Sequence, residues 1–194
     1  MSASAQPNLF PTAFAPPLVS GLTCVSEAIG ADDEQRLARF VASLDFKPFE
    51  FRGFIGNRRT ASFGWRYDFN GGGFQRADAM PGALQHAREI VTGRLGLTAN
   101  DFEQCSVIEY APGAGIGWHK DRPHFGKVAG VSLLTPCRLR LRCPRDGGGW
   151  ERAAVLLEPR SAYLLDGEVR NVWQHSIPAL ERLRYSITFR TLAC

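Results

Sequence analysis

The chain of 194 residues is long enough to form one domain with a sizeable core, and its 44% hydrophobic and 22% charged residues are ordinary for a soluble globular protein. No apolar run approaches the length that crosses a bilayer, so the sequence excludes a helical membrane protein. The formal net charge of +4 permits a polyanionic partner such as nucleic acid but does not require one.

The first residues and the cysteines indicate how the chain is organised. Residues 1–20 are rich in Pro, Ala and Ser without periodicity, which predicts a flexible N-terminal arm, and residues 21–194 then form a single domain. Five cysteines occur without a CxxC pair, and no basic segment followed by an apolar one opens the chain. We therefore expect free thiols in a reducing, cytoplasmic setting.

Two segments have the spacing of amphipathic helices. Residues 30–45 carry three acidic side chains, at positions 32–34, in their first turn, where the helix dipole favours them. An apolar stripe at helical spacing follows them: Leu37, Phe40, Val41 and Leu44. Residues 81–96 begin with Pro and carry Gly near their end, both of which are helix-boundary signals.

The other segments predict strands. Residues 49–74 contain short aromatic runs broken by "IGN" and "NGGG", which predicts a hairpin-like pair of strands and a loop. From residue 101 onward, short alternating or apolar runs are separated by Gly or Pro, which is typical of a sandwich or barrel. We therefore expect an α+β protein whose N-terminal helices pack on a curved β-structure.

Residues 118–126, "WHKDRPHFG", contain potential metal ligands. His119 and Asp121 point to the same face if this segment is a strand. His124 has the opposite parity and follows a proline, so His175 is the better third ligand. Two histidines and one carboxylate leave coordination positions open, which is typical of non-haem Fe(II) oxygenases. The alternative is a surface His–Asp pair and an unrelated core histidine.

The segment "RYSITFR" at residues 184–190 carries polar side chains at every second position. Arg184, Ser186, Thr188 and Arg190 share one strand face, and the apolar residues share the other. If the polar face points into the protein, its arginines need anionic partners, and a bound dicarboxylate would supply them. The alternative is an edge strand with a solvated basic face.

Together, "EYAPGAGIGWHKD", the distant His175 and the closing "RYSITFR" resemble the AlkB-like family of Fe(II)- and 2-oxoglutarate-dependent dioxygenases. The resemblance covers most of residues 101–194, with five features in the family's order, and "RRTASFGWRYDF" is similar to the family's substrate-lid region. It implies a double-stranded β-helix (jelly-roll) with the N-terminal helices packed on one sheet and a metal-binding core at about residues 101–194.

The resemblance also implies the chemistry. His119, Asp121 and His175 would bind Fe(II), with 2-oxoglutarate and O2 as cosubstrates of an oxidoreductase. 2-Oxoglutarate would be converted to succinate while a methyl C–H of the substrate is hydroxylated. If that methyl group is on a base nitrogen, the product releases formaldehyde and the repaired base.

Further residues would hold the cosubstrate. The resemblance implies that Arg184 pairs with the distal carboxylate of 2-oxoglutarate, that Arg190 lies near the metal-proximal carboxylate, and that Tyr110 donates a hydrogen bond. Ser186 stands where the family has Asn, and Ile108 stands where a polar residue is frequent. We therefore expect 2-oxoglutarate binding to depend more strongly on Arg184 and Tyr110.

A base substrate must be flipped out of a duplex or met in a single strand, and it needs an aromatic face for stacking. The candidate substrate contacts are Arg59, Trp65, Tyr67 and Trp118. A further basic series, Arg138, Arg140 and Arg142, shares one strand face and is either a solvated surface or a stripe that binds a nucleic-acid backbone.

The predicted function is oxidative demethylation of N-alkylated bases in DNA or RNA by a monomer that needs no membrane. One alternative is a 2-oxoglutarate oxygenase that acts on a protein or a small molecule. Another is a catalytically silent nucleic-acid-binding module. A zinc-loaded cupin-like hydrolase is a weaker option, because it would leave the paired arginines without a role.

Overall fold

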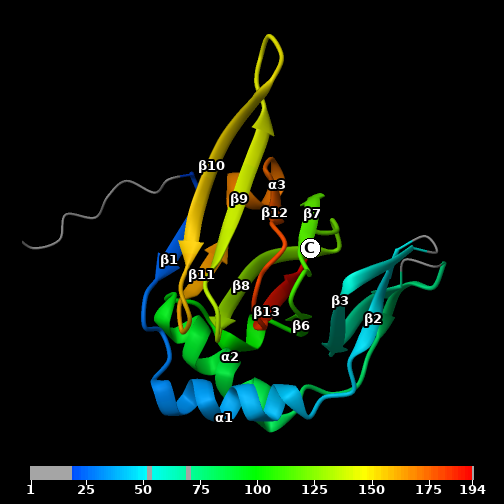
Figure 1. Cartoon of the computed structure of the whole chain (residues 1–194), viewed down its shortest axis with the longest axis vertical. Helices are drawn as coiled ribbons and strands as arrows, with labels where there is room; N and C mark the ends of the chain where they lie inside the picture. Colours follow the sequence, from blue (N-terminus) through cyan, green and yellow to red (C-terminus); the bar gives the residue numbers. More distant parts are fainter. Residues whose placement is uncertain (1–18, 52–53, 69–70, 194) are drawn as a thin grey trace, which may run out of the picture.

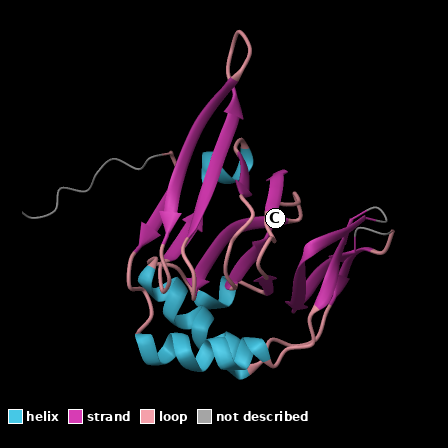
Figure 2. Cartoon of the chain, in the orientation of Figure 1, coloured by secondary structure: helices cyan, strands magenta, loops and turns pink. Residues whose placement is uncertain are grey.

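The computed structural model describes residues 19–51, 54–68 and 71–193, so most of the predicted arm over residues 1–20 lies outside the described residues. Two β-sheets face each other, and α1 (Ala31–Ala42) and α2 (Gly82–Arg94) lie side by side below them (Figure 1). Colouring by secondary structure shows that strands dominate the described chain (Figure 2). The predicted jelly-roll with N-terminal helices on one sheet is confirmed.

The larger sheet contains seven strands in the order β1-β11-β8-β13-β6-β3-β2. Their bounds, in that order, are β1 (Leu22–Val25), β11 (Ala162–Leu165), β8 (Phe125–Leu133), β13 (Arg184–Leu192), β6 (Gln104–Tyr110), β3 (Phe54–Phe63) and β2 (Lys47–Phe51). All of the neighbouring strands in this sheet pair antiparallel.

The smaller sheet has four strands in the order β10-β9-β12-β7. Their bounds are β10 (Trp150–Leu157), β9 (Cys137–Pro144), β12 (Gln174–Ile177) and β7 (Ile116–His119). A separate hairpin consists of β4 (Trp65–Asp68) and β5 (Gly73–Arg76). A 3-10 turn, η1 (Ala99–Asp101), precedes β6, and α3 (Gly167–Asn171) connects the sheets between β11 and β12.

Strand alternation divides the larger sheet into two faces with separate cores. On β13, Tyr185, Ile187 and Phe189 point to the helices and join a buried cluster with Leu84 and Val91 of α2. Burying a side chain of this size stabilises a fold by about 1.5–3 kcal/mol. The opposite face of the sheet closes over a second cluster, which the smaller sheet completes. The polar residues of β13 therefore lie between the two sheets.

The helices are shorter than the predicted segments because their last residues form caps. α1 ends at Ala42, and the Ser43 hydroxyl donates a hydrogen bond to the Phe40 carbonyl at 2.7 Å. At the end of α2, Gly96 adopts a φ of 71°, and the Leu97 amide donates to the Thr92 carbonyl at 2.9 Å. This is the Schellman arrangement, which favours glycine at the left-handed position.

The region predicted as one hairpin contains two. The "IGN" triplet lies inside β3, because β3 pairs with β2 and β6 and needs its full length. The break comes at Gly64, which has a φ of 74° and ends β3. A Cβ atom on Gly64 would lie 2.1 Å from the Glu103 carbonyl oxygen, so only glycine fits there.

Within the described ranges, no helix is long and apolar enough to span a membrane. Cys24, Cys105, Cys137 and Cys143 are free thiols, as expected, and Cys194 lies outside the described residues.

Gly115 provides a test of the contact between β7 and β12. A Cβ atom there would lie 2.7 Å from the Ile177 carbonyl oxygen and 2.8 Å from the Ala179 nitrogen, both backbone atoms that cannot move independently. We expect Gly115→Ala to lower the free energy of unfolding by about 1–3 kcal/mol, which urea denaturation would measure. Gly117→Ala is the matched control, since nothing lies within 4 Å of its Cβ position. Equal stability of the two variants would contradict the close approach.

Candidate active site

His119, Asp121 and His175 converge between the two sheets. His119 ends β7 and lies directly opposite His175 of β12 in the antiparallel register, with 4.2 Å between the ring centroids. Asp121 Oδ1 lies 3.8 Å from Nε2 of each histidine. One potential ligand atom from each of the three residues falls within 4.8 Å of the others. The arrangement can therefore hold one metal ion with three ligands on one side.

Asp121 reaches this position differently from the sequence expectation. β7 ends at His119, so Asp121 lies in the following loop rather than on the same strand face. Its carboxylate is aimed by β13: Arg190 Nε donates to Asp121 Oδ2 at 2.8 Å, and Arg190 Nη1 donates to Gln104 Oε1 at 3.0 Å and to Thr188 Oγ1 at 2.9 Å. Oδ1 is therefore the Asp121 oxygen that faces the two imidazoles.

The loop after Asp121 is held from α3 by a residue that sequence reasoning missed. The Arg170 guanidinium is buried and donates to the backbone carbonyls of Arg122, Phe125 and Gly126. Arg170 lies in a helix of only five residues, so no pattern in the sequence marks it as functional. Arg170 fixes the path of the chain just beyond the potential ligands.

The ionisation states suit metal binding. Burial and the neighbouring His119 lower the pKa of His175 to about 3, and burial also lowers the pKa of His119 although Asp121 opposes this. Burial alone would raise the pKa of Asp121, but the charge of Arg190, aided by His175, holds it well below its usual range. At neutral pH the site therefore offers two neutral imidazoles and one carboxylate, which are the forms that bind a metal.

The tautomer of His119 is fixed by the backbone. Its Nδ1 lies 2.9 Å from the Gly117 carbonyl oxygen, which can only accept a hydrogen bond. Nδ1 therefore carries the proton, and the lone pair of Nε2 faces Asp121 and is available to a metal.

A buried cationic group lies further along β13. Arg184 has no exposed surface, and its Nε donates to the Ser132 hydroxyl at 3.1 Å. Its two terminal nitrogens, Nη1 and Nη2, are buried without a hydrogen-bond partner among the described residues. A buried charge with unpaired donors is costly, and a carboxylate is the ligand that pairs with both terminal nitrogens. This orphaned guanidinium indicates a site for an organic acid.

The polar face of β13 contributes to a cavity of about 50 Å³ between the sheets. Its polar lining comes from Tyr110, His119, Asp121, Tyr163, His175, Ser186, Thr188 and Arg190. Burial raises the pKa of Tyr110 to about 12, so its hydroxyl remains a hydrogen-bond donor. Tyr163, which the sequence did not single out, adds a second phenol to the cavity that Ile108 and Ser186 also line.

A family model described as the 2OG-Fe(II) oxygenase superfamily matches residues 47–190, which is most of the chain and includes all of the residues just described. The chain belongs to this superfamily. The enzymes of this superfamily are oxygenases that use Fe(II), 2-oxoglutarate and O2.

Curated relatives place this oxygenase among the AlkB-like enzymes, as the sequence motifs indicated. The chain is 25% identical over 164 residues to the Mus musculus tRNA (carboxymethyluridine(34)-5-O)-methyltransferase ALKBH8. The aligned region covers 82% of this chain and 24% of that protein. It is 32% identical over 92 residues to the Bos taurus mitochondrial α-ketoglutarate-dependent dioxygenase alkB homolog 7, covering 46% and 41% of the two chains. The chain thus spans about a quarter of the length of ALKBH8.

Solved structures share the fold of this oxygenase. The structure of OsALKBH1 superposes with a TM-score of 0.66 at 14% identity and covers 92% of this chain and 100% of that one. A Pseudomonas putida prolyl-4-hydroxylase gives a TM-score of 0.60 at 16% identity, with 90% and 93% covered. At these identities the likeness shows the fold alone.

The predicted substrate residues are distributed over three places. Trp65 and Tyr67 share a face of the β4–β5 hairpin, where Trp65 stacks on Phe74 with 4.7 Å between ring centroids. Tyr67 and Phe74 contact His124, at 5.5 and 5.2 Å between ring centroids. His124, which belongs to the loop after Asp121, thus packs against this hairpin, and it is absent from the metal-ligand cluster.

Arg59 and Trp118 do not join the site. Arg59 forms a paired hydrogen bond with Glu109 at 2.7 and 2.9 Å on the helix-covered face, because its position in β3 has the opposite parity to the site residues. Its neighbour Arg58 lies opposite Tyr110 and shares the site's face. Trp118 precedes His119 by one residue and therefore points to the outer face of the smaller sheet, beneath Arg140 and Arg142.

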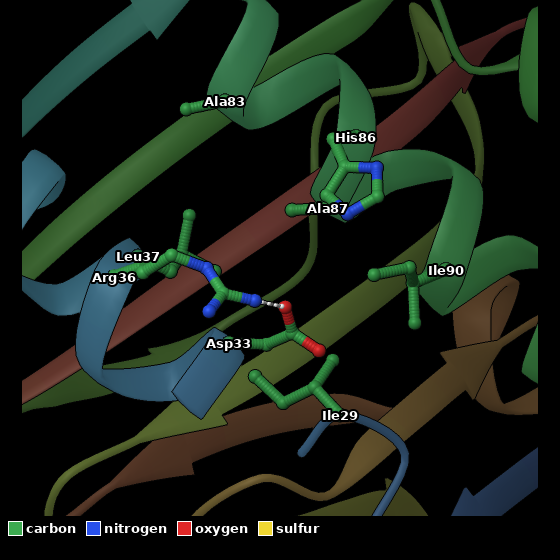
Figure 3. A pocket seen from close by; sticks show the side chains of 8 residues that line it. All are labelled: Ile29, Asp33, Arg36, Leu37, Ala83, His86, Ala87 and Ile90. Atoms are coloured by element: carbon green, nitrogen blue, oxygen red, sulfur yellow. Dashed lines mark hydrogen bonds and ion pairs between the residues drawn. The ribbon is translucent and has the colours of Figure 1, made fainter. Parts of the chain in front are cut away.

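A second hollow, of about 240 Å³, lies away from the metal ligands, between α1 and α2 (Figure 3). Ile29, Leu37, Ala87 and Ile90 supply most of its apolar wall, with the Arg36–Asp33 ion pair at its edge. His86 of α2 also lines this hollow.

Arg184 provides a test that separates stability from function. We expect Arg184→Met to raise the free energy of unfolding without 2-oxoglutarate by about 1 kcal/mol or more, because it removes an unpaired buried charge. Saturating 2-oxoglutarate should raise the melting temperature of the wild type but not of the variant. Arg184→Lys keeps the charge and is the control. Lower stability of Arg184→Met than of Arg184→Lys would contradict the cost assigned to the unpaired guanidinium.

Proposed function

We propose that this dioxygenase oxidatively demethylates N-alkylated bases in DNA or RNA, with His119, Asp121 and His175 as its Fe(II) ligands. The donor set fits this metal, because two imidazoles and one carboxylate leave positions open for cosubstrates. Arg190 supports the set by taking one oxygen of Asp121, so that the other is presented to the ion.

The unpaired guanidinium of Arg184 is the observation that carries the cosubstrate assignment. 2-Oxoglutarate has two carboxylates, and we assign the one distal to the metal to Nη1 and Nη2 of Arg184. Tyr110, Ser186 and Arg190 line the cavity that also contains His119, Asp121 and His175, and they would orient the remainder of the molecule. The phenols of Tyr110 and Tyr163 supply polar contacts on a pocket wall where Ile108 offers none.

When bound, Fe(II) with 2-oxoglutarate and O2 supplies the oxidising chemistry. The side chains of the protein position the metal ligands and shield the cavity from water. Arg190 and Arg170 hold the ligand loop in place, and Val128, Leu139, Leu165 and Ile177 give the cavity apolar walls that exclude water. The product of methyl hydroxylation at a base nitrogen then loses formaldehyde without further assistance.

Nucleic acid is the substrate class that the surroundings of the site support best. Arg58 lies on the site's face with its guanidinium 3.6 Å from the Phe49 ring centroid, and its charge lies near enough to His119 to lower the pKa of that residue. Trp65 and Tyr67 lie on the neighbouring hairpin, where their rings pack against Phe74 and His124. The name of the ALKBH8 relative identifies tRNA as what that protein modifies. A cation and aromatic rings beside the pocket suit a phosphate and a stacked base.

The metal ligands are tested by a pair of histidine variants. We expect His175→Ala to weaken Mn(II) binding by about a hundredfold or more, because it removes one of three ligands. His124→Ala removes a histidine from the same region but leaves the three ligands intact, so it should bind Mn(II) like the wild type. Isothermal titration calorimetry measures both. Loss of the metal in His124→Ala with retention in His175→Ala would overturn the assignment.

The substrate is tested by turnover. Protein with Fe(II), 2-oxoglutarate and O2 should release succinate and formaldehyde in the presence of single-stranded DNA or RNA that contains 1-methyladenine or 3-methylcytosine, and not with the unmethylated strand. Succinate without any dependence on the methylated strand would favour a protein or small-molecule substrate instead. Oligonucleotide binding without any succinate, under conditions where the metal is bound, would indicate a silent binding module.

A further inference from the structure

The outer face of the smaller sheet carries four arginines. In β9, alternation turns Arg138, Arg140 and Arg142 outward and the intervening Leu139 and Leu141 into the core. The register of β10 places Arg152 directly opposite Arg142, on the same outer face. The basic series noted in the sequence is therefore part of a wider surface, which we call the arginine face and define as Arg138, Arg140, Arg142 and Arg152.

The charges of the arginine face are not compensated within the described part of the chain. None of its four guanidinium groups has a carboxylate within 4.0 Å among the ion pairs of the described residues. Arg140 Nε instead donates to the Ser176 hydroxyl at 3.1 Å, and Arg142 Nε donates to Gln174 Oε1 at 2.8 Å. These neutral partners orient the guanidinium planes and leave their positive charge available.

Two indole rings lie among these charges. Arg142 sits between them, with its Cζ atom 4.4 Å from the ring centroid of Trp118 and 4.0 Å from that of Trp150. Arg140 lies 5.2 Å from Trp118. Trp150 keeps 36% of its surface exposed, so its ring is also accessible to solvent. The surface combines ordered cations with accessible π-faces.

The arginine face is connected to the metal ligands through β7. β7 is an edge strand of the smaller sheet, with His119 on its inner side and Trp118 on its outer side. A chain-like ligand can therefore pass over this edge from the site to the arginine face without crossing the sheet. The exposed Lys120 follows directly after His119 and adds a positive charge at the edge.

We propose that the arginine face binds the single strand that flanks the reacting base, with the arginines on its phosphates and Trp150 stacked on a base. The proposal rests on the proposed nucleic-acid substrate and specifies it as a strand several nucleotides long rather than a free nucleotide. Uncompensated arginines match the regularly spaced charges of a backbone, and aromatic rings interleaved with them match bases. An acidic protein segment would use the charges but would leave Trp150 without a partner.

The binding test uses an unmodified oligo-dT strand and fluorescence anisotropy. We expect Arg140→Gln with Arg142→Gln to weaken binding about tenfold at 0.1 M salt and to reduce the slope of log K against log salt by about 1.4, or 0.7 for each lost phosphate contact. Arg39→Gln, which removes an exposed charge from α1 on the far side of the molecule, is the matched control and should bind like the wild type. A double variant that binds like Arg39→Gln would overturn the proposal.

Two further variants keep the test decisive if that double variant unfolds. Arg138→Gln with Arg152→Gln removes two exposed arginines that have no hydrogen bonds to β12, and it should also reduce the salt slope. Trp150→Ala should weaken binding severalfold with the salt slope unchanged, because stacking releases no counterions. Oligo-dT binding that neither variant alters, or an acidic peptide that competes as well as oligo-dT, would refute the proposal.

Turnover separates this proposal from the function on which it rests. If both are correct, the arginine variants should lower kcat/KM on a methylated strand but not on a methylated mononucleotide, which cannot reach the arginine face. Equal loss on both substrates would overturn the arginine face and leave the proposed demethylation intact. Absence of demethylation by the wild type, with oligo-dT binding that still depends on the arginines, would overturn the demethylation and leave the surface intact.

Discussion

The ion pair between Asp121 and Arg190 joins the two sheets at the point where the potential metal ligands meet. Arg190 belongs to β13, a central strand of the larger sheet, whereas Asp121 follows β7, an edge strand of the smaller sheet. Both side chains are largely buried, so removing either partner would leave a buried charge unpaired. Such a change typically lowers the free energy of unfolding by about 3–5 kcal/mol. Gln104 and Thr188 satisfy one terminal nitrogen of the guanidinium. The same pair that closes the sandwich therefore also aims Asp121 at the two histidines.

β13 organises the space around this ion pair because each of its faces has a different partner. Its apolar face forms the core with the helices, which makes the strand a rigid part of the fold. Its polar face then has a fixed position between the sheets, with Arg184, Ser186, Thr188 and Arg190 in one row. A row of this kind holds charges where water is excluded, and there an arginine binds a carboxylate more strongly than it does at the surface.

Three buried arginines have different hydrogen-bond partners, and each set of partners matches a different role. Arg170 is paired with backbone carbonyls and serves to hold a loop. Arg190 is paired with Asp121 and serves to orient it. Arg184 keeps two donors unpaired among the described residues, which lowers stability in the free protein and favours binding of an anion. The arginine face is a fourth case, in which neutral partners and indole rings orient Arg140 and Arg142 and leave their charges for an external partner.

The sequence by itself determined the two helices, most strands of the jelly-roll, and the three residues that converge as a potential metal site. Period-two and helical spacing are local properties, and the His-x-Asp motif with a distant His has a recognisable order. Only the tertiary structure decided that Arg58 rather than Arg59 faces the site, that Trp118 points away from it, and that Asp121 is placed by a loop and an ion pair. Sequence alternation tells which residues share a face, but which face is the inner one depends on strand register and on what packs against the sheet.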